Sequence, residues 1–258
     1  MSTFEPGMFV PAPGRGRLGR MLLVQARTEA TLALRHGEQV LLTLLIPLAL
    51  LVGMTLVHVV ALPEPRVNSV TPSVFALAVM SSAFTGQAIA LGFDRRYGVV
   101  KRLAATAIPR WLLVAGRLLA ALIVVVLQLV VLGAVALALG WSPTLGGIAW
   151  TALLALLGTL AFGALGVLLG GSLRAEIVLA VANIVWFALL LAGGIVVPLS
   201  ALPSGLAAVV QFLPSGALAE SLRAVLATGA APGVQPVLVL LFWCVAGAGL
   251  AARTTRLT

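Results

Sequence analysis

Long apolar runs separated by short polar stretches dominate the chain. Runs of about 20 apolar residues suit helices that cross a membrane, whereas a soluble protein alternates apolar and polar positions around a core. The pattern therefore predicts an all-α membrane protein with six transmembrane helices and short connections. The expected spans cover residues 40–61, 72–93, 111–139, 146–170, 177–197 and 236–252, within a single transmembrane domain of residues 1–258.

Ahead of the first span, residues 18–38 predict an amphipathic helix that lies on the membrane surface. One side of its helical wheel collects small and apolar side chains, namely Leu22, Leu23, Ala26, Ala30, Ala33 and Leu34. Its charged residues are Arg20, Arg27, Arg35 and Glu38, while Gln25, Glu29 and His36 interrupt the apolar side. Residues 1–17, rich in Pro and Gly, predict a mobile tail.

Residues 203–229, between the fifth and sixth spans, are long enough to cross a membrane but are broken by polar and helix-ending residues. These are Pro203, Gln211, Pro214, Glu220 and Arg223. A proline interrupts a helix because it lacks the donor that the next turn needs. We therefore expect two short half-helices on the outer surface, where surrounding protein covers the broken backbone.

A charged island at residues 93–117 separates the second and third spans. It holds six of the sixteen basic residues, Arg95, Arg96, Lys101, Arg102, Arg110 and Arg117, beside Asp94. An uncompensated Arg or Lys at the bilayer centre costs several kcal/mol, so the island is expected in a cytoplasmic loop.

Wound as one helix ending at Pro109, residues 95–108 would place an apolar set on one arc and mostly polar residues opposite. The apolar set is Val99, Val100, Leu103 and Ala107, and the polar set is Arg95, Lys101, Arg102 and Thr106. This layout favours a helix that docks on a cytosolic partner. A basic loop that only sets the membrane orientation is the alternative.

The charge balance supports an orientation and excludes nucleic-acid binding. The chain is 61% hydrophobic and 9% charged, with a net charge of +9. In the six-span layout, every Lys and Arg except Arg66 and Arg223 falls on the same side of the membrane. Lys and Arg residues next to spans favour the cytoplasmic side. Both termini are therefore expected in the cytoplasm, and the positive charge is expected to meet membrane lipid and a protein partner.

Catalytic motifs are missing from the sequence. It contains no G-x-x-x-x-G-K-[ST], no H-E-x-x-H and no paired His and Cys residues, so we expect a chain without catalytic residues, metal or cofactor of its own. Polar residues inside the spans could instead line a substrate pathway or bond neighbouring helices together; they are Ser81, Thr85, Gln87, Gln128 and Asn183. Gly166 and Gly170 have the spacing of close helix packing, expected within the subunit.

Two motifs add a resemblance to this picture. The island contains Asp94, Arg95, Arg96, Tyr97 and Gly98, followed by Lys101, Arg102, Leu103, Thr106 and Pro109. The second motif is GGIVVPLSALP at residues 193–203 with QFLPSGALAESLRAVL at residues 211–226. Their order and the six-span layout resemble the type-2 ABC exporter permease family over nearly the whole chain, with drug exporters fitting best. The chain departs from that family at Val99, where Thr is usual, and at Lys101, where an acid is common.

The resemblance implies that the island is a cytoplasmic coupling helix for a separate ATPase. Its coupling residues would be Asp94, Arg95, Arg96, Gly98, Val100, Lys101, Arg102, Leu103 and Thr106. The implied partners are two cytosolic ATPase subunits, which bind ATP and Mg, and a second permease subunit, identical or homologous. The implied activity is export of a hydrophobic or amphiphilic, drug-like or lipid substrate across the plasma membrane. A polysaccharide or lipid-linked glycan exporter, a non-transporting scaffold and a passive channel are the alternatives.

Overall fold

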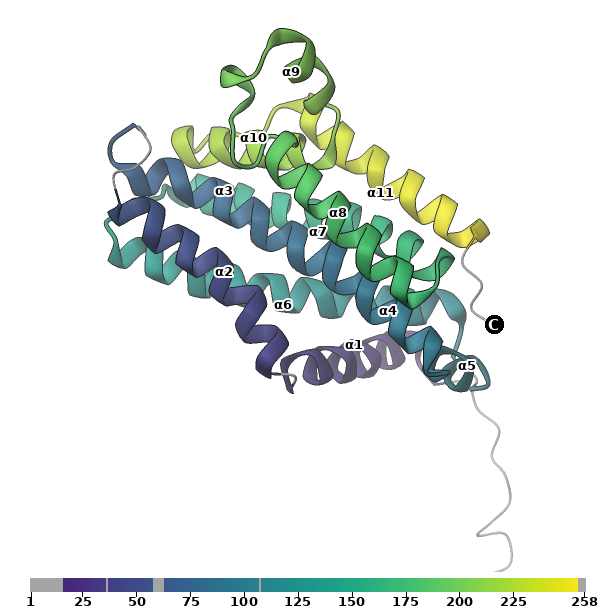
Figure 1. Cartoon of the computed structure of the whole chain (residues 1–258). Coiled ribbons are helices and arrows are strands. Elements are labelled where there is room, and N and C mark those ends of the chain that lie inside the picture. Colours follow the sequence, from purple (N-terminus) through teal and green to yellow (C-terminus); the bar gives the residue numbers. More distant parts are fainter. Residues whose placement is uncertain (1–15, 36, 58–62, 107, 255–258) are drawn as a thin grey trace, which may run out of the picture.

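The computed structural model describes residues 16–35, 37–57, 63–106 and 108–254, and these form helices with no strand (Figure 1). The all-α fold class is thereby confirmed. Among the described residues, five helical stretches are long and apolar enough to cross a membrane: Arg66–Arg96, Trp111–Ala138, Leu145–Ser172, Ala175–Ala192 and Val234–Thr254. The first of them joins α3 (Arg66–Met80), the π-helix η1 (Ser81–Gly86) and α4 (Gln87–Arg96).

The remaining helices are α1 (Leu18–Arg35), α2 (Gly37–Leu56), α5 (Val99–Ala104), α6 (Arg110–Ala138), α7 (Leu145–Ser172), α8 (Ala175–Ala192), α9 (Ser204–Val210), α10 (Pro214–Thr228) and α11 (Val234–Thr254), with a short 3-10 turn, η2 (Leu199–Ala201). The expected first span corresponds to α2, which contains the apolar stretch Thr43–Leu56. Most of the predicted tail, residues 1–15, lies outside the described residues, as do residues 58–61 of that span.

Helix α7 occupies the middle of the bundle, with α3, η1, α4, α10 and α11 packed around it (Figure 1). Leu154 and Phe162 of α7 are fully buried against a core that includes Leu218 of α10 and Leu240 of α11. Gly170 lies directly against the Ala88 carbonyl of α4. The prediction that the glycines of this helix serve close packing within the subunit is confirmed.

Two of the expected span limits are wrong. The second long helix begins at Arg66, after the extended Pro65, and not near residue 72. Arg66 can start a buried helix because its guanidinium donates to the carbonyl oxygens of Met54 (3.0 Å from Nη2) and Val57 (3.0 Å) at the end of α2. The fifth helix, expected to reach residue 197, ends at Ala192, because the chain leaves the helix through Gly193 and Gly194.

Helices α9 and α10 meet at a bend of 95°. At the start of α10, Ser215 lies against Gly193 after α8, and Gly229 after its end lies against Thr144 and Gly146 at the start of α7. Both neighbours belong to the same end of the bundle, so the pair stays at that end. We call it the far end, and the end that carries α1, α4 and α5 the charged end.

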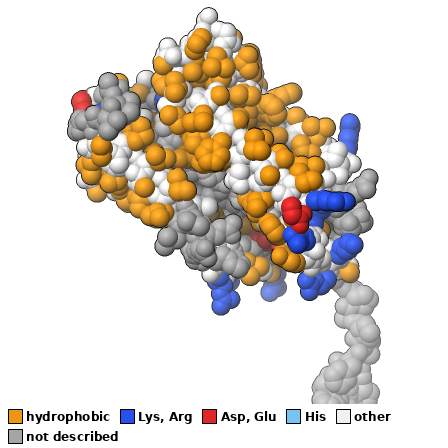
Figure 2. Space-filling view, in the orientation of Figure 1, with side chains coloured by type: hydrophobic (Ala, Val, Ile, Leu, Met, Phe, Trp, Pro, Cys, Tyr) orange, Lys and Arg blue, Asp and Glu red, His pale blue; other side chains and the backbone are white. Residues whose placement is uncertain are grey.

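Charged and hydrophobic side chains are distributed differently between the two ends of the bundle. Figure 2 shows Lys and Arg side chains gathered over the charged end, while the rest of the visible surface is mainly hydrophobic. Helix α11 returns the chain to the charged end, where Thr254 Oγ1 lies 3.2 Å from Ser172 Oγ at the end of α7. An apolar belt with a basic border is the surface expected of a protein held in a bilayer.

Candidate functional site at the charged end

The island is bent and does not form one helix. Helix α4 continues to Arg96, and Gly98 then takes a left-handed conformation (φ 70°) that glycine adopts without strain. Helix α5 follows, and it ends at Ala104. The expected single helix over residues 95–108 is therefore wrong. Pro109 does not end the island's helix, which already ends at Ala104; with its extended backbone it is the N-cap residue of α6.

Three consecutive residues at the end of α4, Asp94, Arg95 and Arg96, contact three different helices; we call them the charged triplet. Asp94 accepts a hydrogen bond from Arg117 of α6. Arg95 Nη1 donates to the carbonyl oxygens of Gly170 (2.9 Å) and Leu173 (3.0 Å) at the end of α7. Arg96 forms an ion pair with Glu176 in the first turn of α8.

Each of these contacts suits the helix end that it meets. The last carbonyl groups of α7 have no N–H donor within their own helix, so a cationic donor stabilises them. The acidic Glu176 lies at a helix N-terminus, where negative charge is favoured. The triplet thus ties the ends of α6, α7 and α8 to the island.

Arg117 joins α1 to the same cluster. Arg117 is 7% exposed, its guanidinium pairs with Asp94, and its Nη2 lies 3.8 Å from Glu29 Oε1 of α1. Gln25 Nε2 donates to the same Glu29 oxygen over 3.0 Å. A small cavity of about 20 Å³, enough for one water molecule, opens beside these residues and Leu103. Gln25 and Glu29, which interrupt the apolar side of α1, therefore bind the rest of the site, while His36 lies outside the described residues.

The apolar side of α1 packs partly on protein. Ala26 and Ala30 are buried, because α1 lies along α6, whereas Leu23 is 65% exposed. Among the charged residues expected on this helix, Arg20, Arg27 and Arg35 are exposed. Helix α1 ends at Arg35, and Glu38 belongs to α2, so the expected limit at residue 38 is wrong.

The side of α5 that faces outward is polar. Val100 is 5% exposed and packs against Leu91, Val167 and Ala251, so it does not belong to an outward-facing apolar arc as the helical wheel predicts. Leu103 is half-buried, and Ala107 lies outside the described residues. The exposed side chains are Lys101, Arg102 and Thr106, with Arg102 Nη2 donating to the Tyr97 carbonyl (3.2 Å) and Thr106 Oγ1 to the Leu103 carbonyl (2.6 Å).

The polar residues expected along a pathway are not gathered in one place. Gln128 is buried, accepts from Ser82 Oγ (2.7 Å) and donates to Thr43 Oγ1 (3.3 Å), so it links α6, η1 and α2. Ser81 Oγ accepts from Trp186 Nε1 of α8 over 2.9 Å. For Gln128, Ser81 and Ser82 the structure shows bonds between helices, as expected for polar residues that join neighbouring spans.

The other three pathway candidates differ in surroundings. Asn183 is exposed and donates to the Leu179 carbonyl of its own helix (2.8 Å). The Thr85 hydroxyl is buried without a hydrogen-bond partner, and Gln87 is half-buried. A pathway role for them stays a prediction.

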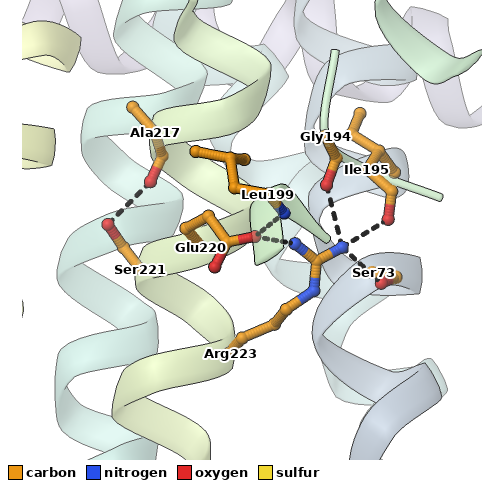
Figure 3. A network of polar contacts seen from close by, with 8 residues as sticks. All are labelled: Ser73, Gly194, Ile195, Leu199, Ala217, Glu220, Ser221 and Arg223. Atoms are coloured by element: carbon orange, nitrogen blue, oxygen red, sulfur yellow. Dashed lines mark hydrogen bonds and ion pairs between the residues drawn. The ribbon is translucent and has the colours of Figure 1, made fainter. Parts of the chain in front are cut away.

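A second polar network lies at the far end, around Arg223 of α10 (Figure 3). Its Nη1 donates to Glu220 Oε1 (2.7 Å), and its Nη2 lies 3.1 Å from Ser73 Oγ, 2.8 Å from the Gly194 carbonyl and 2.6 Å from the Ile195 carbonyl. The sequence predicts for Arg223 and Glu220 only that they interrupt a span, and for Arg223 that it lies away from the basic border. The signal for their role is a pair of opposite charges three positions apart in an otherwise apolar stretch.

Within the part of the chain that the structure describes, no group of three His, Cys, Asp or Glu side chains could hold a metal ion. The site is therefore built from ion pairs and helix-end contacts. It can hold helices together and can present positive charge to a partner.

An apolar helical bundle with a basic end and a pair of bent helices at the opposite end defines a multi-pass membrane protein. The model of the ABC-2 type transporter family matches residues 18–227, and the chain belongs to this family. The resemblance seen in the island and in residues 193–226 is thereby confirmed. No curated protein sequence matches the chain.

Membership in the family describes the chain in general terms. It is a permease of an ABC exporter, embedded in a membrane. Such permeases are transmembrane subunits, generally without enzymatic activity, and they generally work with ABC ATPase partners.

Proposed function

We propose that this permease exports a hydrophobic or amphiphilic, drug-like or lipid substrate across the plasma membrane, driven by two separate ATPase subunits that dock at the charged end. A second permease subunit completes the assembly. The observation that carries the proposal is the charged triplet, because Asp94, Arg95 and Arg96 attach the island to three helices of the bundle. A loop that only set the membrane orientation would need positive charge but no such attachments.

The docking surface consists of the outer side of α5 and the exposed side of α1. Lys101 and Arg102 are exposed on α5, and Arg27 is exposed on α1. Positive side chains of this kind fit acidic groups on a protein partner. The buried Val100 sits behind them, so a displacement of α5 reaches Leu91 of α4 and Val167 of α7 directly through packed side chains.

The substrate class rests on the polar groups inside the bundle. Gln128, Ser82 and Thr43 satisfy one another, and Ser81 is bonded to Trp186. These residues leave little hydrogen-bonding capacity for a sugar, which needs many partners, and the buried Thr85 hydroxyl without a partner adds a single group. The acidic side chains that the structure describes lie toward the ends of the bundle, which suits a neutral or amphiphilic cargo better than coupling to protons or sodium ions.

The orientation follows from the basic border. Lys and Arg side chains gather over the charged end (Figure 2), which favours placing that end in the cytoplasm. Since α1 and the end of α11 both lie there, both termini are proposed to be cytoplasmic. The helices α9 and α10 are then on the outer side.

Charge reversal on the docking surface tests the proposal. The variant Lys101→Glu with Arg102→Glu should lose the copurified ATPase and ATP-driven uptake of a fluorescent amphiphilic dye by inverted vesicles, because like charges then face the partner's acids. Arg174→Glu is the matched control, since Arg174 is exposed at the same end but outside α5. Full ATPase retention in the double variant would reduce the island to an orientation signal. Retention and ATP turnover without dye uptake in the parent would point to another cargo or to a scaffold.

A further inference from the structure

Helix α8 lies at the edge of the bundle. Its outer side chains, including Ile184, Phe187 and Leu191, are exposed. Its inner side packs through small residues on α4, where Val178 and Ala182 are buried against Ala88. The first half of α8 therefore packs closely against α4, the helix that carries the charged triplet.

Polar contacts hold α8 at three levels along its length. Glu176 in the first turn pairs with Arg96 of the triplet. Near the middle, Trp186 Nε1 donates to Ser81 Oγ of η1. Beyond the last turn, Arg223 of α10 binds the carbonyl oxygens of Gly194 and Ile195. Between the first and last levels lies a helix of 18 residues, about 27 Å long at 1.5 Å per residue.

At the far end, Arg223 binds backbone carbonyl groups that follow the end of α8. The chain leaves α8 through Gly193, and Gly194 takes a positive φ of 83°, so the following carbonyl groups have no helical partners. The planar guanidinium of Arg223 reaches both carbonyls and Ser73 of α3, as Figure 3 shows. Glu220, one turn earlier in α10, accepts from the Leu199 backbone N–H over 2.9 Å. The segment 194–199 is thus bound to α10 at both of its ends, by Arg223 and by Glu220.

We propose that α8 transmits displacement of the charged end to α9 and α10, and that Arg223 is the positioning residue that completes this link. The proposal rests on the proposed function, since the displacement originates in ATPase docking at α5. A helix that packs on α4 along its first half moves with α4, and because both of its ends are bound, that movement acts on residues 194–199. The far end then responds to the state of the ATPase although it does not touch it.

Distances between spin labels test the link in the full chain with its ATPase in proteoliposomes. In a Cys244→Ala background, one pair of labels at Tyr97 and Arg253, outside the docking surface, reports on the charged end, and a second pair at Leu145 and Val209 reports on the far end. These four side chains are exposed. Addition of ATP should change both distances in the parent. In Arg223→Lys the first change should persist and the second should be lost, because one ammonium cannot bind two carbonyls, Ser73 and Glu220 together.

Arg66→Lys is the matched control. Arg66 also binds carbonyl groups at a helix end, those of Met54 and Val57, but it does so on α2 and not on α8. It should therefore leave both distance changes intact, whereas a general loss of packing would alter them equally in the two lysine variants.

Each contrary outcome identifies what failed. A change at the charged end without any change at the far end of the parent overturns the link and leaves the proposed function standing. An unchanged response in Arg223→Lys overturns the role of Arg223. No change at the charged end with ATPase bound overturns the proposed function itself.

Discussion

Gly166 of α7 lies so close to Phe84 of η1 that a β-carbon on the glycine would sit 2.7 Å from the Phe84 carbonyl oxygen. Backbone meets backbone at this point. The contact holds the central helix against the π-helix, where the side chains of Ser81 and Ser82 bind α8 and α6. The relative positions of these helices therefore depend on the absence of a side chain at one residue.

Gly166→Ala should destabilise the protein by about 1–3 kcal/mol, because the added methyl group meets backbone that cannot turn aside. Gly249→Ala in α11 is the control, since a β-carbon there would meet nothing within 4 Å. The control should be neutral or stabilising by up to about 1 kcal/mol, because alanine favours helix over glycine. Thermal unfolding in detergent compares the two variants. Equal transition temperatures would show that α7 and η1 are not in backbone contact.

The ion pairs of Arg117 and Arg96 should differ in how much they stabilise the folded protein. Arg117 is 7% exposed, so Arg117→Gln leaves Asp94 and Glu29 without their cation and should cost about 2–3 kcal/mol. The side chains of Arg96 and Glu176 are 50% and 63% exposed, so Arg96→Gln should cost less than about 1 kcal/mol. Thermal unfolding in detergent measures both. A larger loss in the Arg96 variant would contradict the burial at the charged end.

The apolar runs were sufficient to predict the long helices, because a bilayer fixes how many apolar residues a helix needs. The two short helices before α11 also followed from local chemistry, since proline suits the start of a helix and Pro203 and Pro214 stand at the starts of α9 and α10. These features depend on residues that are neighbours in the sequence. A single sequence is informative about them for that reason.

Features that depend on distant partners were missed. Gln25 and Glu29 interrupt the amphipathic pattern of α1. The structure gives the reason, because Glu29 lies beside Arg117 and Gln25 donates to Glu29. The helical wheel of the island assumed an unbroken helix, but glycine can either continue or end one, and Gly98 ends it. The consequence is that Val100 points to the inside of the bundle and not to a partner.

Val100→Asp should therefore damage the fold of the permease itself. A carboxylate would be placed among Leu91, Val167 and Ala251 at a cost of several kcal/mol, because Arg117, which lines the same small cavity, already pairs with Asp94 and Glu29. Lys101→Asp, at the next and exposed position, should change the unfolding free energy by no more than about 0.5 kcal/mol. Yield of folded protein and thermal unfolding without any ATPase present separate the two. A stable Val100→Asp protein would restore the outward-facing arc.

The orientation of the bundle is open to direct labelling. Single cysteines at Lys101, Ser204 and Arg253, each in a Cys244→Ala background, are placed at the charged end, on α9 and at the end of α11. A membrane-impermeant maleimide should label Ser204→Cys in intact cells and the other two only after permeabilisation, because the basic end is expected inside.

The Arg253 position makes this test specific for the bent helices. If α9 and α10 together crossed the membrane, α11 would run in the opposite direction and Arg253→Cys would label from outside. The structure opposes such a crossing, since Gly193 before the pair and Gly229 after it both lie at the far end, and Thr254 lies beside Ser172 at the charged end. Labelling of Ser204→Cys and Lys101→Cys from the same side would contradict the proposed orientation altogether.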